Sequence, residues 1–358
     1  MKGFLMVGVI FAFAILIVPA LLVTGFSGGN ALDSAPVSVR GSQATVETTK
    51  EQTGTNDKKE TKPATTYELP TEAQTVSVFR STTEMIEEVP LEEYIIGVVA
   101  SEMPASYEME ALKAQALTAR TYYIRQILDG ADLELPEGAD VTDTVMHQVF
   151  KNEAELKENW GSDYDWMMSR IQKAVYDTEG QIITYEEEPI TATFFSTSNG
   201  YTENSEEYWP NEIPYLRSVE SPWDLESPRY KDVREISAGE FQELLQVNLP
   251  DGEVGEIVSR TTGGRVAEVK IGDKTFTGRD IRDKLELDSS DFDWSRNGDT
   301  VVIETRGWGH GVGMSQFGAD GMAKAGNDYR DIIHYYYQGV SIVEAATVLA
   351  QTDFGKNS

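Results

Sequence analysis

The sequence predicts an α+β fold of mixed helices and antiparallel strands around a substrate cleft, preceded by one transmembrane helix and a disordered tether. Three observations support this prediction. Residues 4–26 are uncharged and mainly apolar, residues 27–75 are polar and nearly free of aromatic residues, and the rest of the chain mixes helical and strand-like patterns. Because those patterns do not alternate as regular strand–helix–strand units, a purely parallel sheet is not expected.

The N-terminal apolar run begins after Lys2, the only charge before it, and as a helix it is long enough to cross the hydrocarbon core of a membrane. A cleaved signal peptide usually has a shorter apolar region followed by an Ala-x-Ala-like site, which is not evident here. We therefore expect residues 1–26 to be an uncleaved anchor rather than a removed leader. With Lys2 on the cytoplasmic side, we expect a single-pass cell-membrane protein whose main domain is extracytoplasmic.

The segment that follows, residues 27–75, is rich in Ser, Thr, Gly, Gln, Lys and Glu. Such a composition cannot bury enough apolar surface to offset the entropy lost on ordering, so we interpret it as a flexible extracytoplasmic linker. The remaining chain divides into a domain of residues 76–345 and a C-terminal tail of residues 346–358.

The composition excludes several functions. The formal net charge of −30 argues against nucleic-acid binding and against adsorption to anionic lipid through charge alone. There is no cysteine, which removes disulfides and thiolate metal sites. The three histidines have no paired spacing, so we expect no metal and no cofactor.

The domain begins with a hairpin and a helix. Residues 75–79 alternate as a strand does, and residues 83–88 can pair with them. Pro90 then favours a helix start. This helix should end near residues 101–104, because the residue before Pro104 is disfavoured in helical geometry.

A second helix is expected over residues 107–128, with acids in its first turn and a glycine just past its end. Lys113 and Arg120 lie seven residues apart and therefore share a face, which also carries Leu117. Each is either an ordinary solvated helix charge or a residue that contacts substrate and tunes a nearby acid.

Later elements are expected to be a helix at 166–176, strands at 181–186 and 191–196, a polar loop at 196–204, a β-rich stretch at 254–304 with turns at 262–264 and 272–274, a helix at 278–285, and a last helix at 328–337 that ends at Gly339.

The most informative residue is Glu102, an isolated acid among small and apolar neighbours in the sequence Val-Val-Ala-Ser-Glu-Met-Pro-Ala. Such neighbours desolvate the carboxyl group and raise its pKa, as a general acid working near neutral pH requires. The predicted helix end places Glu102 where a cleft can expose it. We therefore predict that Glu102 is the catalytic acid.

Two polar, glycine-marked segments are expected to converge on the same cleft. The first, Thr197-Ser-Asn-Gly-Tyr-Thr202, contains Ser198 and Tyr201, which can bind sugar or peptide groups, although the segment can also be a plain loop. The second, residues 307–319, contains His310 and Gln316 and has glycines that allow close backbone approach. His310 either positions substrate or is structural. The second segment lacks the features of a phosphate-binding P-loop or of a dinucleotide fingerprint, and neither Ser101 nor Ser198 lies in a Gly-x-Ser-x-Gly elbow.

Together these segments resemble the stage II sporulation protein D family, which is shared with cell-wall amidase enhancer proteins. The resemblance rests on Glu102-Met-Pro, the Glu110-Ala-Leu-Lys-Ala-Gln-Ala-Leu-Thr-Ala-Arg-Thr-Tyr helix, the Ser-Asn-Gly-Tyr-Thr-Glu-Asn loop and the Gly-His-Gly-Val-Gly-Met-Ser-Gln-Phe-Gly-Ala segment, and it covers about residues 75–345. It implies a membrane-anchored lytic transglycosylase that cleaves peptidoglycan glycan strands between N-acetylmuramic acid and N-acetylglucosamine during engulfment of the forespore. It also implies partners: the amidase stage II sporulation protein P, which strips the stem peptides, and the membrane protein stage II sporulation protein M.

On the family pattern Glu102 matches the catalytic acid, and Lys113 and Arg120 match positions implicated around the site. Protonated Glu102 would donate to the glycosidic oxygen and, as carboxylate, would accept the proton of the muramic acid's own hydroxymethyl group, closing an anhydro ring; glycoside hydrolases normally use two carboxyl groups. Ser198, Tyr201, His310 and Gln316 would line the cleft. Some relatives bind zinc after the second helix, where this chain offers only His147 as a ligand, so we expect no zinc. The alternatives are a non-catalytic glycan-binding module that stimulates a separate amidase, or a structural tether.

Overall fold

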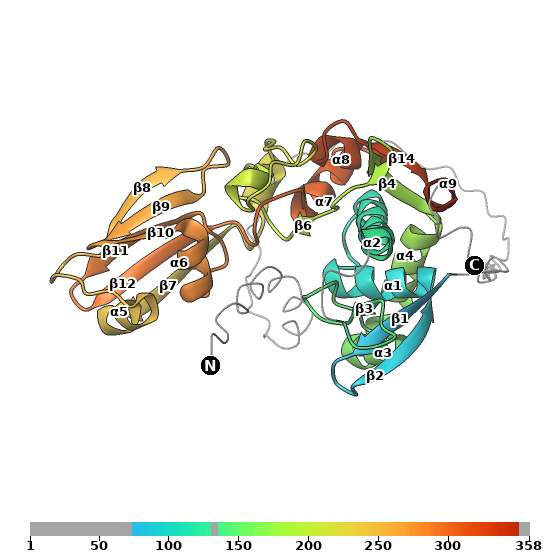
Figure 1. Cartoon of the computed structure of the whole chain (residues 1–358), viewed down its shortest axis with the longest axis horizontal. Helices are drawn as coiled ribbons and strands as arrows, with labels where there is room; N and C mark the ends of the chain where they lie inside the picture. Colours follow the sequence, from blue (N-terminus) through green and yellow to red (C-terminus); the bar gives the residue numbers. More distant parts are fainter. Residues whose placement is uncertain (1–73, 130–134, 351–358) are drawn as a thin grey trace, which may run out of the picture. The chain divides into compact units, whose positions relative to one another are not determined.

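A computed structural model of the chain describes residues 74–129 and 135–350 (Figure 1). These residues form the α+β fold that the sequence predicts, with mixed helices and mainly antiparallel strands. The anchor predicted over residues 1–26 lies outside the described residues, as do nearly all of the linker and residues 351–358 of the tail. In the part of the chain that the structure describes, no helix has the length and apolar character needed to span a membrane.

Within residues 74–129 and 135–350, the helices include three short 3₁₀ segments, labelled η. The helical elements are α1 (Leu91–Glu102), α2 (Met109–Asp129), α3 (Glu153–Trp160), η2 (Gly161–Asp163), α4 (Tyr164–Tyr176), η3 (Ser205–Glu207), η4 (Pro222–Glu226), α5 (Ala238–Leu245), α6 (Gly278–Lys284), α7 (Gln316–Lys324), α8 (Tyr329–Tyr336) and α9 (Ala345–Leu349).

The strands form several small sheets rather than one large one. They are β1 (Thr75–Arg80), β2 (Met85–Pro90), β3 (Val141–Thr142), β4 (Gln181–Tyr185), β5 (Glu188–Pro189), β6 (Phe194–Phe195), β7 (Lys231–Ser237), β8 (Glu256–Arg260), β9 (Val266–Ile271), β10 (Lys274–Thr277), β11 (Phe292–Asn297), β12 (Thr300–Arg306), β13 (Met314–Ser315) and β14 (Ser341–Glu344). The strand orders in the sheets are β2-β1-β3, β14-β4-β5, β13-β6, β11-β12-β7 and β10-β9-β8.

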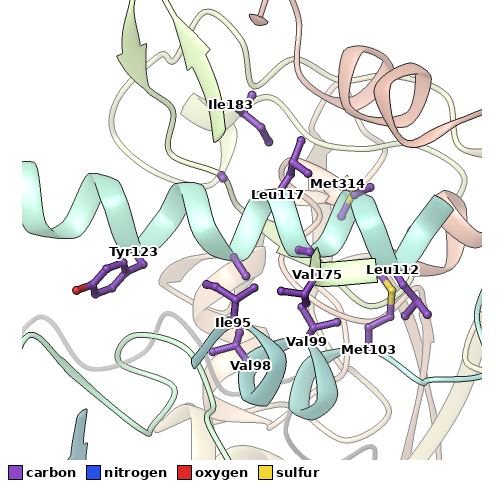
Figure 2. Close-up of a cluster of buried hydrophobic side chains, with 14 of the residues drawn as sticks. Ile95, Val98, Val99, Met103, Leu112, Leu117, Tyr123, Val175, Ile183 and Met314 are labelled. Carbon is purple, nitrogen blue, oxygen red and sulfur yellow. The ribbon is translucent and has the colours of Figure 1, made fainter. Parts of the chain in front are cut away.

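The larger hydrophobic core is built around α1 and α2, which pack against each other and against α4. Apolar residues occupy nearly the whole of α1, so that it is buried almost all round, as expected of a core helix. Figure 2 shows side chains of this core, among them Ile95 and Val99 of α1, Leu117 of α2 and Val175. Burying a side chain of this size contributes about 1.5–3 kcal/mol. This core therefore fixes α1, and Glu102 with it.

A second hydrophobic core lies in the stretch from β7 to β12, where α5 and α6 accompany two three-stranded antiparallel sheets. In β12, alternate residues from Val301 to Thr305 are buried, which is the period-2 pattern of a half-buried strand. The turns predicted at 262–264 and 272–274 are confirmed, because β8, β9 and β10 pair antiparallel across them. This stretch separates the two polar segments in sequence.

The strand predicted over residues 191–196 is mostly wrong: only Phe194–Phe195 is a strand, and it pairs parallel to β13. The reason is that backbone groups of residues 191–193 form hydrogen bonds with side chains. The Thr191 amide donates to the Tyr215 hydroxyl at 2.8 Å, and the Thr193 carbonyl accepts the Tyr337 hydroxyl at 2.6 Å. Helices α3, α5, α7 and α9 were not predicted.

Gly97 lets the segment after β3 approach α1. A Cβ at this position would lie 2.6 Å from the Lys151 carbonyl oxygen and would also overlap the Phe150 ring. We expect Gly97→Ala to destabilise the protein by about 1–3 kcal/mol through overpacking, measured by urea unfolding. Gly239→Ala in α5, where a Cβ meets only the Ser237 hydroxyl at 3.8 Å, should be neutral or stabilising. Equal stability of the two variants would contradict this account of the packing.

Candidate active site

Glu102 is the last residue of α1, which stops there because Met103 takes an extended conformation before Pro104. Its side chain is only 4% exposed. Oε1 accepts a hydrogen bond from the Val149 amide at 3.2 Å, and Oε2 is buried with no hydrogen-bond partner among the described residues. Burial, opposed by the Val149 hydrogen bond, raises the pKa of Glu102 to about 8. The carboxyl group is therefore mostly protonated at neutral pH.

This geometry differs from the predicted one in one respect. The helix end does not expose Glu102 in a cleft, because the loop that carries Val149 lies against its carboxyl group. A surface cavity of about 500 Å³ lies between β2, α1, α3 and α4, but Glu102 is not among its lining residues.

Gln316 brings the glycine-rich segment to Glu102. Its side-chain amide donates to the Glu102 carbonyl oxygen at 3.0 Å and to Gln115 Oε1 at 3.2 Å. Gln316 is the first residue of α7, whose N-cap is Ser315, so the orientation of its side chain follows from the start of this helix. The ends of α1 and α7 and the middle of α2 thus meet beside the acid.

Asp224, which the sequence did not single out, connects the same region to the Ser198 loop. Its buried carboxylate accepts hydrogen bonds from the Ser198 amide at 3.0 Å and the Ser198 hydroxyl at 2.9 Å. It also accepts the hydroxyl protons of Ser315 at 2.7 Å and Ser221 at 2.5 Å. Burial raises the pKa of Asp224, and these donors oppose the shift. Because Ser315 precedes Gln316, one carboxylate fixes both the loop and the start of α7.

The two polar segments also meet through their backbones. Thr197 and Trp308 exchange amide-to-carbonyl hydrogen bonds of 3.0 and 2.7 Å, and the Glu203 amide donates to Gly311 at 2.7 Å. Tyr201 is 46% exposed, and its hydroxyl donates to Glu220 at 3.4 Å. The two segments are therefore hydrogen-bonded to each other, while Ser198 itself is fully buried.

His310 occupies a structural position. Its Nδ1 faces the Val312 amide at 3.1 Å and its Nε2 faces the Phe194 carbonyl at 3.0 Å, so the neutral tautomer with a proton on Nε2 satisfies both. The ring lies among Phe195, Tyr208 and Trp209. Burial and nearby arginines lower the pKa of His310 to about 3. It stays neutral and holds β6 to the glycine-rich segment.

Arg120 and Lys113 share a face of α2, as their spacing predicts, but both are engaged by the protein. Arg120 is fully buried and forms a two-pronged ion pair with Glu92, with nitrogen–oxygen distances of 2.9 and 2.6 Å. Lys113 is paired with Glu110 at 2.9 Å and Asp177 at 3.1 Å. Arg120 thus lies within the core, whereas Lys113 lies nearer the surface in a cluster of ion pairs.

The segment after α2 contains two buried side chains with unsatisfied polar atoms. His147 accepts from the Thr142 amide at 3.3 Å through Nδ1, whereas its Nε2 and both side-chain polar atoms of Gln148 have no partner among the described residues. Burial lowers the pKa of His147 to about 4. Within residues 74–129 and 135–350, no group of three or more His, Cys, Asp or Glu side chains is suited to hold a metal ion.

Comparison with known proteins places these features in context. Residues 79–185 match the family model described as "Stage II sporulation protein". The chain is 49% identical over 351 residues to stage II sporulation protein D of Bacillus subtilis (strain 168), covering 98% of each chain. It is 47% identical over 338 residues to the protein of the same name in Bacillus amyloliquefaciens, covering 94% of each chain.

A more distant relative is the amidase enhancer of Bacillus subtilis (strain 168), which is 30% identical over 301 residues. That match covers 69% of this chain and 40% of the relative. All of the site residues described above from Glu102 to Arg120 fall within the segment matched by the family model.

Proposed function

This chain belongs to the stage II sporulation protein D family, and from that premise we propose that it is a lytic transglycosylase that cleaves peptidoglycan glycan strands between N-acetylmuramic acid and N-acetylglucosamine. The observation that carries the proposal is the buried Glu102 carboxyl group, whose pKa of about 8 keeps it protonated at neutral pH. A general acid must hold its proton until it donates it.

Among the described residues, no other carboxylate contributes to the pKa shift of Glu102, which comes from burial and the Val149 amide, and this favours ring closure over hydrolysis. Among the described residues, the partners of its side chain and carbonyl are the Val149 amide and the Gln316 amide, neither of which is an acid. Glu203 also has a raised pKa, of about 7, mainly because of burial, but its partners are Thr261, Gly263 and the nearby Arg265. Inverting and retaining glycosidases use two carboxyl groups that flank the same bond.

The reaction then has two proton transfers through one group. Glu102 gives its proton to the glycosidic oxygen as the bond from that oxygen to the muramic acid C1 breaks. The resulting carboxylate accepts the proton of the muramic acid C6 hydroxyl, whose oxygen forms a new bond to C1. The products are a strand that ends in 1,6-anhydro-muramic acid and a strand with a free hydroxyl, and Glu102 is protonated again. Gln316 holds the Glu102 carbonyl throughout.

Access to the acid requires a movement of the protein. Because Glu102 Oε2 is buried and the Val149 amide binds Oε1, the glycan reaches the proton only when the loop around Val149 shifts. The unsatisfied polar atoms of His147 and Gln148 in that loop lower the cost of the shift, since few hydrogen bonds are lost there.

The proposal extends to the setting of the enzyme. We propose that it is anchored in the cell membrane by residues 1–26, faces the extracytoplasmic side, and acts in forespore engulfment on strands that an amidase, stage II sporulation protein P, has freed of peptides. Stage II sporulation protein M is the proposed membrane partner. Co-purification of the full-length chain with each of these proteins tests this assembly.

The reaction is tested by incubating residues 74–358 with peptide-free glycan strands and analysing the fragments by mass spectrometry. Fragments that end in anhydro-muramic acid are expected. Fragments with reducing muramic acid ends would instead indicate hydrolysis, and no fragments at all would contradict catalysis.

The rate should depend on pH through Glu102. Because the acid must be protonated, we expect kcat/KM for glycan cleavage to fall as pH rises through about 8. A pH–rate profile measured between pH 5 and 10 checks this. A rate that rises through pH 8, or that already falls near pH 5, would contradict the assignment of the proton donor.

A second candidate function is that of an amidase enhancer, which the relative of that name favours. In that role the chain would bind glycan and stimulate a separate amidase without cutting strands. The low exposure of Glu102 is compatible with this role. Stimulation of a partner amidase by the Glu102→Gln variant to the wild-type level, with no fragments from either protein, would favour it.

A further inference from the structure

The Arg229 guanidinium has no protein acceptor among the described residues. No hydrogen bond or ion pair of its guanidinium is found among the described residues, and its Nη1 is buried without a partner. Every other arginine in the described ranges donates to a protein oxygen, except Arg330, which is exposed. The chain has 60 acidic and 30 basic residues, so carboxylates are plentiful, and an arginine without one is unusual.

Trp308 provides a second donor beside it. The Arg229 guanidinium carbon lies 4.4 Å from the centroid of a Trp308 ring, and the indole Nε1 is also buried without a partner. Both nitrogens can only donate hydrogen bonds. The Arg229 guanidinium and the Trp308 indole N–H could therefore donate to the same acceptor. Because the guanidinium is positively charged, an acceptor with negative charge is favoured.

The pair is rigidly built into the two polar segments. The Arg229 amide donates to the Ser227 hydroxyl at 3.2 Å, Ser227 is in hydrogen-bond contact with Thr197 at 3.2 Å, and Thr197 pairs with the Trp308 backbone. Asp288 influences Arg229 electrostatically but forms no ion pair with it, and the pKa of Asp288 is raised to about 6, mainly by burial. No carboxylate among the described residues therefore serves as an acceptor for the Arg229 guanidinium.

The charge of Arg229 also acts on the turn that follows the proposed acid. Tyr107 comes five residues after Glu102, and its ring lies edge-on to Phe317, the neighbour of Gln316, with centroids 6.2 Å apart. The pKa of Tyr107 is raised by burial and by Asp320 and Asp224, and the charge of Arg229 opposes the shift. Arg229 and the Glu102 turn are therefore electrostatically coupled through Tyr107.

We propose that Arg229 and Trp308 form a subsite for a carboxylate carried by the glycan, namely the lactyl carboxylate that a muramic acid residue regains when its stem peptide is removed. This inference rests on the proposed function. A planar guanidinium binds a carboxylate through two parallel hydrogen bonds, and the indole donor adds a third. An intact stem peptide converts the carboxylate to a neutral amide, so the subsite selects peptide-free strands.

The test compares two substrates that differ only in this charge. Peptide-free strands and the same strands with the carboxyl groups converted to methylamides are cleaved by wild type and by Arg229→Gln. We expect the wild-type kcat/KM to be roughly ten- to hundredfold higher on the free carboxylates. Arg229→Gln should cleave both substrates at the lower rate, and Trp308→Phe should lose part of the preference. Arg330→Gln, which removes another arginine stacked on an aromatic ring, should keep it in full.

Two further measurements distinguish failure of the subsite from misfolding of the Arg229→Gln variant and from failure of the proposed reaction. The thermal midpoint of Arg229→Gln shows whether it folds, and Arg229→Lys, which keeps the charge, should restore part of the preference. Binding of both substrates to Glu102→Gln, followed by tryptophan fluorescence, does not depend on cleavage. If wild type cleaves nothing but Glu102→Gln binds the free carboxylates more tightly through Arg229, the subsite stands and the reaction fails. If wild type cleaves both substrates equally, or Arg229→Gln keeps the preference, the subsite is refuted.

Discussion

Glu102→Gln should lower the rate of glycan cleavage by about a hundredfold to ten-thousandfold, the usual contribution of a general acid. The amide has nearly the same shape as the acid and can still accept the Val149 hydrogen bond, but it has no proton to give. Cleavage of peptide-free strands at saturating substrate measures the effect. Glu108→Gln, which removes an exposed acid six residues away, is the matched control and should cleave normally. Retained cleavage in Glu102→Gln would require another proton donor.

The same substitution should not weaken the fold. In the folded protein the Glu102 pKa is about 8 rather than its ordinary 4.5, so the folded state binds the additional proton between these pH values. Its contribution to stability is therefore fully present below about pH 4.5 and is lost as pH rises through 8. The glutamine does not ionise, so Glu102→Gln should gain stability over wild type as pH rises from 5 to 9. Urea unfolding at both pH values checks this, and an unchanged difference would contradict the burial of the carboxyl group.

Arg120→Met should destabilise the protein by about 3–5 kcal/mol, because it leaves the Glu92 carboxylate buried without its cation. The Arg120 guanidinium also donates to the Gln181 and Val175 carbonyl oxygens, which would lose their donors. Urea unfolding measures the loss. Any fall in activity should follow the unfolded fraction, since the folded protein offers no surface of Arg120 to a substrate.

Removing both the Arg120 and the Glu92 charges distinguishes a structural role of Arg120 from a role in substrate binding. The double variant Arg120→Met, Glu92→Leu has no uncompensated charge and should recover much of the lost stability, and activity with it. Arg125→Met, which removes a more exposed arginine of α2, should change stability by less than about 1 kcal/mol. If the double variant were stable but inactive, Arg120 would have a direct part in the reaction after all.

The elements around Glu102 were predictable because residues close in the sequence determine where they begin and end. Pro90 and Pro104 restrict the backbone at the two ends of α1, and this restriction does not depend on tertiary contacts. The same holds for the turns of β8 to β10. Helix α3 was missed although Asn152 and Glu155 form a capping box, a signal that the sequence does contain.

Helix α7 was not predictable in this way because its glycines serve packing. A Cβ at Gly318 would overlap the Tyr336 and Ser221 hydroxyl groups, and one at Gly321 would overlap the Trp223 side chain. These glycines leave room on the helix surface where other segments approach, but glycine has a low helix propensity, so the local pattern does not predict a helix here. Gln316 owes its position beside Glu102 to this contact.

The remaining site residues depend on long-range contacts. Asp224 has no periodic or motif signal, and its role follows from donors that come from three separate segments. Lys113 and Arg120 were placed correctly on one helix face, but two of the acids that pair with them, Glu92 and Asp177, come from elsewhere in the chain. Helix spacing alone cannot tell a face that contacts substrate from one that is covered by the protein.

The central claim is that one buried, protonated carboxyl group drives ring closure without water as the nucleophile. Digestion of peptide-free strands in water enriched in heavy oxygen, followed by mass spectrometry of the new ends, tests it directly. The account predicts anhydro-muramic acid ends that contain no heavy oxygen, and no new ends with Glu102→Gln. Heavy oxygen at the C1 position of newly formed ends would show that water attacks, and would contradict it.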